Sequence, residues 1–495
     1  MDQPFDTRPF PFDNSYARDL EGFYVPWQGS KAPKARIALL NEGLAASLGL
    51  DLDASDPMLA EILAGSETAE GSMPLAQAYA GHQFGGFSAQ LGDGRALLLG
   101  ELLDGEGQRF DLHLKGSGPT PFSRGGDGKA VLGPVLREYL MGEAMHALGI
   151  PTTRALAAVT TGELVPREGL KPGAVLVRVA ASHLRVGTFQ FFAARQEWDK
   201  LKTLADYAIA RHAPDLREAD NPYLALLEEV SRRQAHLIAQ WMQVGFIHGV
   251  MNTDNMTISG ETIDYGPCAY MDHYDPATVF SSIDHMGRYT YGNQPPVARW
   301  NLARFAETLV PLIDPDNEER AINLATDVIA DFMPIYKEAY HAGMAKKIGL
   351  SSLERGDDKL IDDLLTTLRG QSIDFTSTFR ALADTLRSGR EPILTLFEDR
   401  EGIVGWLERW QARLSSEDRD GAAIADAMDR VNPLYTPRNH LVDAALVKAE
   451  GEADLEPFKA LLAVLADPFT KREGLDSYVG PAPQNFGPFV TYCGT

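Results

Sequence analysis

The first half of the chain alternates short apolar runs with glycine-rich turns. Residues 95–100, 110–115 and 174–180 are such runs, and their length and composition predict β-strands. Between the second and the third lies an apolar four-residue repeat typical of an amphipathic helix, formed by Leu136, Leu140, Ala144 and Leu148. We therefore expect a small sheet with one helix packed on it. Before this part, a helix is predicted over residues 37–48.

Helical periodicity dominates the second half. One predicted helix ends before Gly245, and its apolar face is formed by Val230, Leu237, Ile238 and Trp241. A short polar hairpin is predicted over residues 256–264, with Ser259 and Gly260 in its turn. Three further helices between about 300 and 470 are indicated by Leu302, Phe305 and Leu309, by Leu360, Leu364 and Leu368, and by Ile403, Trp406 and Trp410.

A β-rich part followed by a larger helical part predicts an α+β fold with a bilobal plan. Nucleotides are commonly bound in the cleft of such a plan. We expect four segments: an N-terminal extension, a β-rich lobe, the core of a helical lobe, and a C-terminal helical region with a cysteine-containing tail. Their boundaries are predicted at residues 1–70, 71–190, 191–310 and 311–495.

The composition narrows the classes of partner. The chain has 495 residues and a formal net charge of −23, with 46 Lys and Arg against 69 Asp and Glu. An excess of this size argues against a nucleic acid or an anionic membrane as partner, because both need a cationic surface. Two cysteines, Cys268 and Cys493, cannot form a disulfide framework. With no apolar run of about 18 residues and no signal-peptide pattern, we expect a monomeric protein of the cytoplasm.

Several common catalytic motifs are absent. Residues 125–129 (Gly-Gly-Asp-Gly-Lys) have the look of a phosphate-binding loop. However, Ala130 follows the lysine, and Ser123 stands where the first glycine of that loop belongs. Neither a His-Glu-x-x-His zinc helix nor a Gly-x-Ser-x-Gly nucleophile elbow occurs.

The β-rich part carries candidate phosphate ligands. Gly92 and Gly94 form a tight turn with Arg95, where backbone N–H groups could approach phosphate oxygens, although a plain hairpin turn would have the same sequence. Lys115 ends a predicted strand next to a Gly-Ser-Gly segment, and Glu138 of the following helix could hold it in an ion pair; a solvated lysine and an exposed helical glutamate are the alternatives. Arg178 interrupts an apolar strand, and a buried arginine needs an anionic partner.

The strongest local signal is the segment 248–255 (His-Gly-Val-Met-Asn-Thr-Asp-Asn), followed after the predicted hairpin by Asp264-Tyr-Gly. Asn255 and Asp264 stand at the two ends of that hairpin, and together they suit Mg²⁺ bound to nucleotide phosphates. Asp254 is then free to accept a proton from an attacking hydroxyl. The alternative is a polar loop in which these side chains cap turns.

The order of these parts is that of a protein-kinase-like fold: glycine turn, strand lysine, helix glutamate, catalytic loop, then Asp-x-Gly. One position departs from the order. Kinases with a His-Gly-Asp catalytic loop have their base directly after His-Gly, and here that position is Val250. Ordinary transfer of the γ-phosphoryl group is therefore not expected.

The chain resembles the selenoprotein O (SelO, YdiU) family of pseudokinases over nearly its whole length. The strings that carry the resemblance are Tyr79-Ala-Gly-His-Gln-Phe-Gly-Gly-Phe, Leu91-Gly-Asp-Gly-Arg95, residues 113–124, residues 248–255, Ile263-Asp-Tyr-Gly-Pro267, Gly287-Arg-Tyr, Asn293-Gln-Pro295, Asn432-Pro433, Pro437-Arg-Asn439 and Cys493-Gly-Thr495.

The resemblance implies a kinase fold that binds ATP in a flipped orientation and transfers AMP to hydroxyl groups of proteins, releasing pyrophosphate. It implies that Asp254 is the proton acceptor and that Glu138 orients Lys115. Asn255 and Asp264 would hold Mg²⁺ or Mn²⁺. The nucleotide would be contacted by Gly92, Gly94, Arg95, Lys115, Asp127, Gly128, Arg178, Arg185 and Asp264.

Three questions remain open at this level. In some members of the family a selenocysteine occupies the place of Cys493, and pairing of Cys493 with Cys268 would tether the tail near the site; two separate thiols are the alternative. The protein could also be a conventional phosphotransferase. A catalytically silent nucleotide-binding scaffold is the third class, although it would not need the full set of Lys115, Glu138, Asp254, Asn255 and Asp264.

Overall fold

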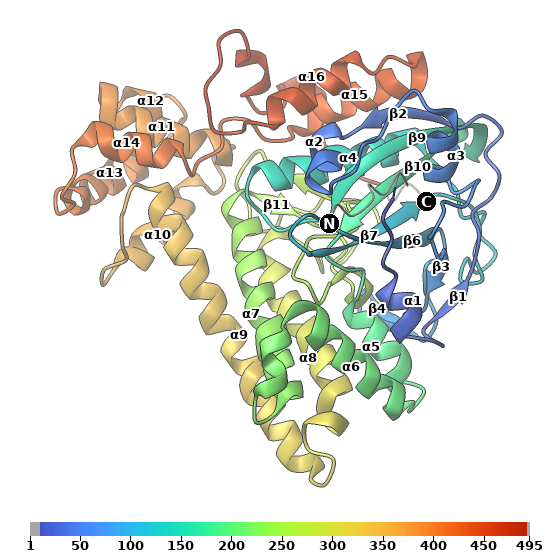
Figure 1. The fold of residues 1–495 in the computed structure, drawn as a ribbon. Helices are drawn as coiled ribbons and strands as arrows, with labels where there is room; N and C mark the ends of the chain where they lie inside the picture. Colours follow the sequence, from blue (N-terminus) through green and yellow to red (C-terminus); the bar gives the residue numbers. More distant parts are fainter. Residues whose placement is uncertain (1–9, 493–495) are drawn as a thin grey trace, which may run out of the picture.

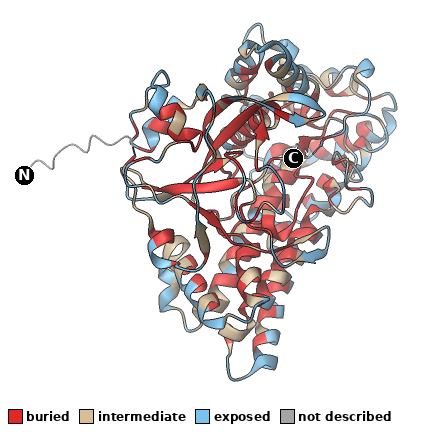
Figure 2. Cartoon of the chain, turned by 90° about the vertical axis from the view of Figure 1, so that its right-hand side faces the viewer, coloured by how far each residue is buried: buried red, intermediate tan, exposed pale blue. Residues whose placement is uncertain are grey.

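A computed structural model describes residues 10–492 and contains an antiparallel sheet of eight strands (Figure 1). The strand order is β1-β3-β6-β7-β10-β9-β2, and β8 pairs with β10. The strands are β1 (Tyr24–Pro26), β2 (Arg36–Leu40), β3 (Leu75–Gln77), β6 (Ala96–Leu103), β7 (Arg109–Lys115), β8 (Ala130–Val131), β9 (Arg154–Arg167) and β10 (Gly169–Ala180). The three predicted strands of the sequence are thus confirmed as β6, β7 and β10. Most residues of these three strands are buried (Figure 2).

The predicted helix over 37–48 is wrong in its first half. Residues 36–40 form β2, which pairs with β9 at one edge of the sheet, and only α2 (Glu42–Ser47) is helical. Asn41 separates the two elements, and its side chain accepts a hydrogen bond from Leu44 N at 3.0 Å, which begins the helix. Strands β1 and β2 extend the same sheet as β6, β7 and β10, so residues before 71 contribute to it; this part also contains α1 (Ser15–Asp19) and α3 (Pro57–Leu63).

Helix α4 (Leu132–Ala147) is the helix predicted from the four-residue repeat, and it packs against β9 and β10. From the opposite side it is covered by α15 (Asn439–Glu452) and α16 (Glu456–Leu465), which lie across the top of the sheet-containing part in Figure 1. Glu450 of α15 accepts a hydrogen bond from Gly133 N at 2.9 Å and forms an ion pair with Lys171 at 2.7 Å. The C-terminal helices therefore anchor the first turn of α4.

The helical part begins after β10 and has long helices at its centre. Helix α7 (Pro222–Gln243) packs against α8 (Gln294–Ile313) and α9 (Glu318–Lys347), and the predicted helix end before Gly245 is confirmed. Two shorter helices, α5 (Val186–Ala193) and α6 (Trp198–His212), precede α7. Two small two-stranded sheets are separate from the main sheet. One is formed by β4 (Gly81–Gln83) and β5 (Gly86–Ser88), the other by β11 (Phe246–Ile247) and β12 (Ala269–Tyr270).

A cluster of helices lies at the C-terminal end of α9 (Figure 1). Its core contains Trp406 and Trp410, whose rings stack with centroids 5.5 Å apart and whose N–H groups donate to the carbonyls of Leu360 and Ile348. The cluster consists of α10 (Asp357–Leu368), α11 (Phe375–Ser388), α12 (Glu391–Leu394), α13 (Glu401–Leu414) and α14 (Gly421–Asp429). The chain is thus α+β, with a sheet-containing part and a helical part. Within residues 10–492, no helix is both long enough and apolar enough to cross a membrane.

Lys347, the last residue of α9, is buried among the rings of α11. Its Nζ lies 4.1 Å from the centroid of Phe379, and burial lowers the pKa of its ammonium group to about 7. Between pH 7 and the pKa of the unfolded chain, near 10.5, the unfolded state holds a proton that the folded state has released. Stability contributed at this position therefore rises with pH, and the full cost of burying the charge is present below pH 7.

We expect Lys347→Met to stabilise the protein at pH 6 by about 1–3 kcal/mol, because the desolvation cost exceeds the cation–π attraction. The gain should shrink toward pH 9. Urea denaturation of both proteins at the two pH values measures it. Lys346→Met is the matched control, since Lys346 is exposed and its replacement should change little at either pH. A gain that is the same at pH 6 and pH 9 would contradict this account of Lys347.

Candidate active site

Lys115 and Arg178 meet two carboxylates on one face of the sheet. In the β7–β10 ladder Lys115 pairs with Leu176, so Lys115 and Arg178 point to the same side, toward α4. Glu138 of α4 accepts from Lys115 Nζ at 2.6 Å and from Arg178 Nη2 at 2.6 Å. Asp264 Oδ1 accepts from the same two groups at 2.7 and 2.6 Å. The predicted Lys115–Glu138 pair is present, and Arg178 has the anionic partners that its burial requires.

Asp264 is bound by three cations. Besides Lys115 and Arg178, the guanidinium of Arg185 lies 3.4 Å from its Oδ2. Burial alone would raise the pKa of the Asp264 carboxyl, but the three cations hold it well below its usual range. The pKa of Glu138 is likewise lowered by Arg178 and Lys115 against the effect of burial. Both carboxylates are therefore ionised. Three cations and two anions form a charged cluster, which consists of Lys115, Glu138, Arg178, Arg185 and Asp264.

Asp254 is buried beside this cluster in a different environment. It lies in a single 3₁₀ turn, Thr253–Asn255, and its backbone carbonyl accepts from Arg185 Nη1 at 3.0 Å. Its Oδ2 accepts from Gln83 Nε2 at 3.2 Å, whereas its Oδ1 is buried without a hydrogen-bond partner among residues 10–492. Burial raises the pKa of the Asp254 carboxyl to about 6. This is the setting of a carboxylate that can accept a proton near neutral pH.

The predicted hairpin over residues 256–264 is wrong in its pairing. Its two arms bridge outward instead, Thr257 to Arg185 and Thr262 to Thr152. The turn is closed by the Thr257 hydroxyl, which donates to the Glu261 carbonyl at 2.7 Å and accepts from its N–H at 3.0 Å. The loop still brings its ends to the site, and Asp264 adopts a left-handed conformation there, with φ of 60°.

Asn255 and Asp264 have the chemistry of a divalent-cation site. The Asn255 amide donates from Nδ2 to the Val250 carbonyl at 3.0 Å, which leaves its Oδ1 as an acceptor. Within the described residues no group of three or more His, Cys, Asp or Glu side chains could hold a metal by itself. One carboxylate and one amide oxygen, completed by phosphate oxygens, is nevertheless a donor set that Mg²⁺ accepts.

The glycine turn at 92–94 is anchored next to β7. Asp93, which lies between the two glycines, is fully buried; it accepts from Gln77 N at 3.0 Å, and its Oδ2 lies 3.2 Å from His113 Nε2. The alternative of a plain hairpin turn is wrong, because β5 pairs with β4 while β6 pairs with β3 and β7. Gly92 has φ of 75°, and a Cβ atom there would lie 2.3 Å from the Phe122 ring. Only glycine fits at this position.

Asp127 and Gly128 lie outside the charged cluster. Asp127 is exposed and forms a two-pronged ion pair with Arg167, at 2.9 and 3.0 Å. Gly128 has φ of 65°, and its carbonyl accepts from Gly118 N at 3.1 Å, which ties this loop to the glycine segment after Lys115. Among residues 10–492, no hydrogen bond or ion pair joins Arg95, Asp127 or Gly128 to a side chain of the cluster, so their contact with nucleotide stays a prediction.

Two side chains at the site were missed by reasoning from residue types. Tyr79 lies under Arg185, whose guanidinium is 4.5 Å from the ring centroid. Gln83 is the hydrogen-bond donor to Asp254. Both belong to the string 79–87, which carried part of the family resemblance but suggested no chemical role. An uncharged amide has no sequence signal that would mark it as a partner of Asp254.

The end of the chain packs beside the segment that follows Asp264. Thr491 donates from its hydroxyl to the Pro267 carbonyl at 2.8 Å, and its N–H donates to the Phe280 carbonyl at 2.8 Å. Cys268, the next residue after Pro267, is buried, and burial raises the pKa of its thiol to about 11. The choice between pairing with Cys493 and two separate thiols involves a residue outside the described part of the chain.

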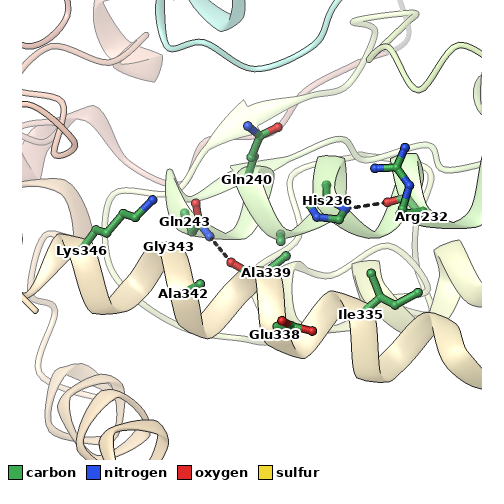
Figure 3. A pocket seen from close by; sticks show the side chains of 11 residues that line it. Arg232, His236, Gln240, Gln243, Ile335, Glu338, Ala339, Ala342, Gly343 and Lys346 are labelled. Atoms are coloured by element: carbon green, nitrogen blue, oxygen red, sulfur yellow. Dashed lines mark hydrogen bonds between the residues drawn. The ribbon is translucent and has the colours of Figure 1, made fainter. Parts of the chain in front are cut away.

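A groove of about 560 Å³ lies between α7 and α9, away from these residues (Figure 3). Its lining includes Arg232, His236 and Gln240 of α7 and Glu338 and Lys346 of α9. None of the predicted site residues contributes to it. The charged cluster, and not this groove, is therefore the candidate active site.

Comparison with known proteins bears on what the cluster does. The family model described as "Protein adenylyltransferase SelO" matches residues 9–466. The chain belongs to the SelO family. It is 58% identical over 488 residues to a "Protein nucleotidyltransferase YdiU" of Cereibacter sphaeroides, covering 98% of this chain and 100% of that one. Proteins of the same description from Mycobacterium sp. and Rhodopseudomonas palustris are 56% and 54% identical, with 98% of this chain and 99% of each relative covered. The expected family is confirmed, and with it the reaction class, nucleotidyl transfer onto proteins.

Proposed function

We propose that this nucleotidyltransferase binds ATP at the charged cluster and transfers AMP to hydroxyl side chains of proteins. The observation that carries the proposal is the excess of cations around Asp264, where Lys115, Arg178 and Arg185 surround two carboxylates. Such a cluster is suited to neutralise phosphate oxygens. Asp254, buried beside it with an oxygen free of hydrogen bonds to the described residues, supplies the proton acceptor.

The fold that this proposal implies is protein-kinase-like. Its support is the order and contact of three elements: Lys115 on a central strand, Glu138 on α4, and the 254–264 loops of the helical part. The sequence predicts a single helix on the sheet, but α2 and α3 also pack against it. On this reading the four segments 1–70, 71–190, 191–310 and 311–495 are extension, β-rich lobe, helical core and C-terminal region. The anchoring of α4 by Glu450 gives the C-terminal region a structural role.

Asn255 and Asp264 would hold Mg²⁺ or Mn²⁺. The metal would neutralise charge on the phosphate oxygens and on the departing pyrophosphate. Lys115 would then exchange part of its contact with Asp264 for a phosphate oxygen, while Glu138 keeps it in place. Gly92, Gly94, Arg95, Asp127 and Gly128 are proposed as further nucleotide contacts, in the loops around β6 and β7.

Asp254 is proposed to accept the proton of the acceptor hydroxyl. The hydroxyl oxygen forms a bond to the α-phosphorus, the bond from that phosphorus to the β-phosphate bridging oxygen breaks, and pyrophosphate leaves with the electron pair. The flipped orientation of ATP would bring the α-phosphate to the metal. Val250 then stands where a kinase keeps its base, without a role in this reaction.

The identity of the released product tests the proposal. Purified protein is incubated with ATP, Mg²⁺ or Mn²⁺ and dephosphorylated casein, and the products are separated by ion-exchange chromatography. We expect pyrophosphate in a one-to-one ratio with AMP bound to casein. ADP together with phosphorylated casein would favour the phosphotransferase alternative instead, and an absence of any product would favour the silent scaffold.

Gly81→Ala should reduce AMP transfer by about tenfold or more while ATP binding is kept. A Cβ atom at Gly81 would lie 2.5 Å from Asp254 Oδ1, so the carboxylate must move, and small misplacements of a reacting group are costly. The matched control is Gly105→Ala, where a Cβ atom would have no neighbour within 4 Å. Initial rates and calorimetric ATP titrations measure the two effects. Unchanged transfer in Gly81→Ala would mean that Asp254 does not need this position.

A further inference from the structure

The β4–β5 hairpin closes over the catalytic loop. On its inner side, Gln83 donates to Asp254, and Gly81 lies so close to the same carboxylate that no side chain fits between them. His82 N donates to Thr253 Oγ1 at 2.7 Å, and Phe84 N donates to the Tyr289 hydroxyl at 3.1 Å. The hairpin is therefore fixed to the loop that carries the proposed base.

The outer side of the same hairpin is apolar and open. Phe87 is 45% exposed and Phe84 is 37% exposed, although large apolar side chains are usually covered. Phe84 lies 5.1 Å from the Tyr289 ring, and Phe87 lies 4.9 Å from the His82 ring, between centroids. These adjacent rings form one surface, and it begins at Phe84, the residue after the Gln83 that donates to Asp254.

A cation borders this surface. Arg288 lies over the Trp300 ring, 4.7 Å from its centroid, and its guanidinium approaches Gly85 of the hairpin turn. Among residues 10–492 no carboxylate forms an ion pair with Arg288, and its Nε is buried without a hydrogen bond. Its neighbour Arg304 is already paired with Glu307 at 2.6 Å. His82 is held neutral, because burial and these two arginines lower its pKa. Within the described part of the chain, Arg288 is therefore a cation without a paired carboxylate, in a protein whose net charge is −23.

We propose that Phe84, Phe87, Arg288 and Trp300 form a docking ledge for the acceptor protein. The ledge takes a polypeptide segment in which an acidic residue and an apolar residue lie near the hydroxyl to be modified. The apolar residue packs on the two phenylalanines, the carboxylate pairs with Arg288, and the hydroxyl is brought to Asp254 on the inner side. Charge complementarity selects this occupant, because an unpaired arginine beside aromatic rings attracts carboxylates and repels basic segments. The inference rests on the proposed function.

Acceptor choice tests the ledge. Dephosphorylated casein supplies acidic hydroxyl-bearing segments and histone H1 supplies basic ones, each offered with α-labelled ATP. We expect the wild type to label casein with a several-fold higher kcat/KM. Equal labelling, or preference for histone, would overturn the ledge while leaving AMP transfer intact. If neither acceptor were labelled, both the proposed function and the ledge would be contradicted.

Charge reversal at Arg288 makes the test specific. Arg288→Glu should raise the KM for casein at least about tenfold, which is the effect of roughly 1.4 kcal/mol, and should shift preference toward histone. The KM for ATP should stay unchanged, a split that misfolding would not produce. The matched control is Arg320→Glu, a reversal on the exposed start of α9. If Arg288→Glu lowered the labelling of casein and of histone to the same extent, a role of Arg288 in recognising acidic segments would be contradicted.

Removal of the apolar part is the second arm. Phe87→Ser should raise the KM for casein several-fold with the kcat and the KM for ATP nearly unchanged. Ile322→Ser on α9 is its control, because Ile322 is also 45% exposed. Circular dichroism and ATP binding confirm that each variant is folded. Equal effects of the two serine substitutions would show that exposure alone, and not position over Asp254, accounts for the change, and would overturn the ledge.

Discussion

Asp264→Asn should abolish AMP transfer, lowering kcat by at least about 10³-fold. The substitution keeps the shape of the side chain but removes the charge that pairs with Lys115, Arg178 and Arg185. It also removes the carboxylate proposed for the metal. The measurement is the initial rate of α-label incorporation into casein at saturating ATP and Mg²⁺ or Mn²⁺.

The same variant should be less stable. Lys115 and Arg178 would be left with Glu138 alone, and Arg185 would lose its ion pair with Asp264. Breaking a buried ion pair typically costs about 3–5 kcal/mol. We expect a lower melting temperature that ATP partly restores, since phosphate oxygens can replace the lost carboxylate. Asp206→Asn, which removes an exposed carboxylate paired with Lys202, is the control and should change the melting temperature little. Label transfer near the wild-type rate in Asp264→Asn would contradict both the metal assignment and the role of the cluster.

Asp254→Asn should lower kcat by roughly 10²–10⁴-fold, the usual contribution of a general base. Affinity for ATP should be kept, because within the described residues the Asp254 side chain is hydrogen-bonded to Gln83 and not to the charged cluster. Single-turnover transfer and calorimetric ATP titration separate the two effects. Loss of ATP affinity in parallel with activity would assign Asp254 to nucleotide binding and not to proton transfer.

The wild-type rate should also depend on pH through Asp254. Burial raises its pKa to about 6, and only the ionised carboxylate can accept a proton, so kcat/KM should rise as pH increases through 6 and level off above 7. The residual activity of Asp254→Asn should lack this rise. A wild-type profile that is flat between pH 5 and 8 would contradict proton transfer to this group.

The sequence was most informative where chemistry and local pattern coincide. The apolar runs that end in Lys115 and contain Arg178 predicted β7 and β10, and the four-residue repeat predicted α4, so the pairing of Lys115 with Glu138 followed from the order of elements. The need of a buried arginine for an anion likewise anticipated the partners of Arg178. These are local rules, and they hold for Lys115, Arg178 and Glu138 because one sheet face and one helix supply these three groups. Asp264 comes from a loop of the helical part.

The misses share a physical cause, which is pairing between distant segments. Residues 37–40 have a helical pattern, but they form a strand because they pair with β9. The arms of the loop 256–264 bridge to Arg185 and Thr152 instead of to each other. Gln83 and Asp254 are 171 positions apart, and no property of either residue alone indicates their contact. Only the three-dimensional arrangement places the β4–β5 hairpin over the catalytic loop.

The most direct test of the central claim is the fate of the phosphorus atoms of ATP. Casein is incubated with the protein, Mg²⁺ or Mn²⁺, and ATP labelled either on the α- or on the γ-phosphate, and the protein-bound label is counted. We expect α-label on casein and none from the γ-phosphate, with the α-label lost in Asp264→Asn. Protein-bound γ-label, or α-label that persists undiminished in Asp264→Asn, would contradict the central claim.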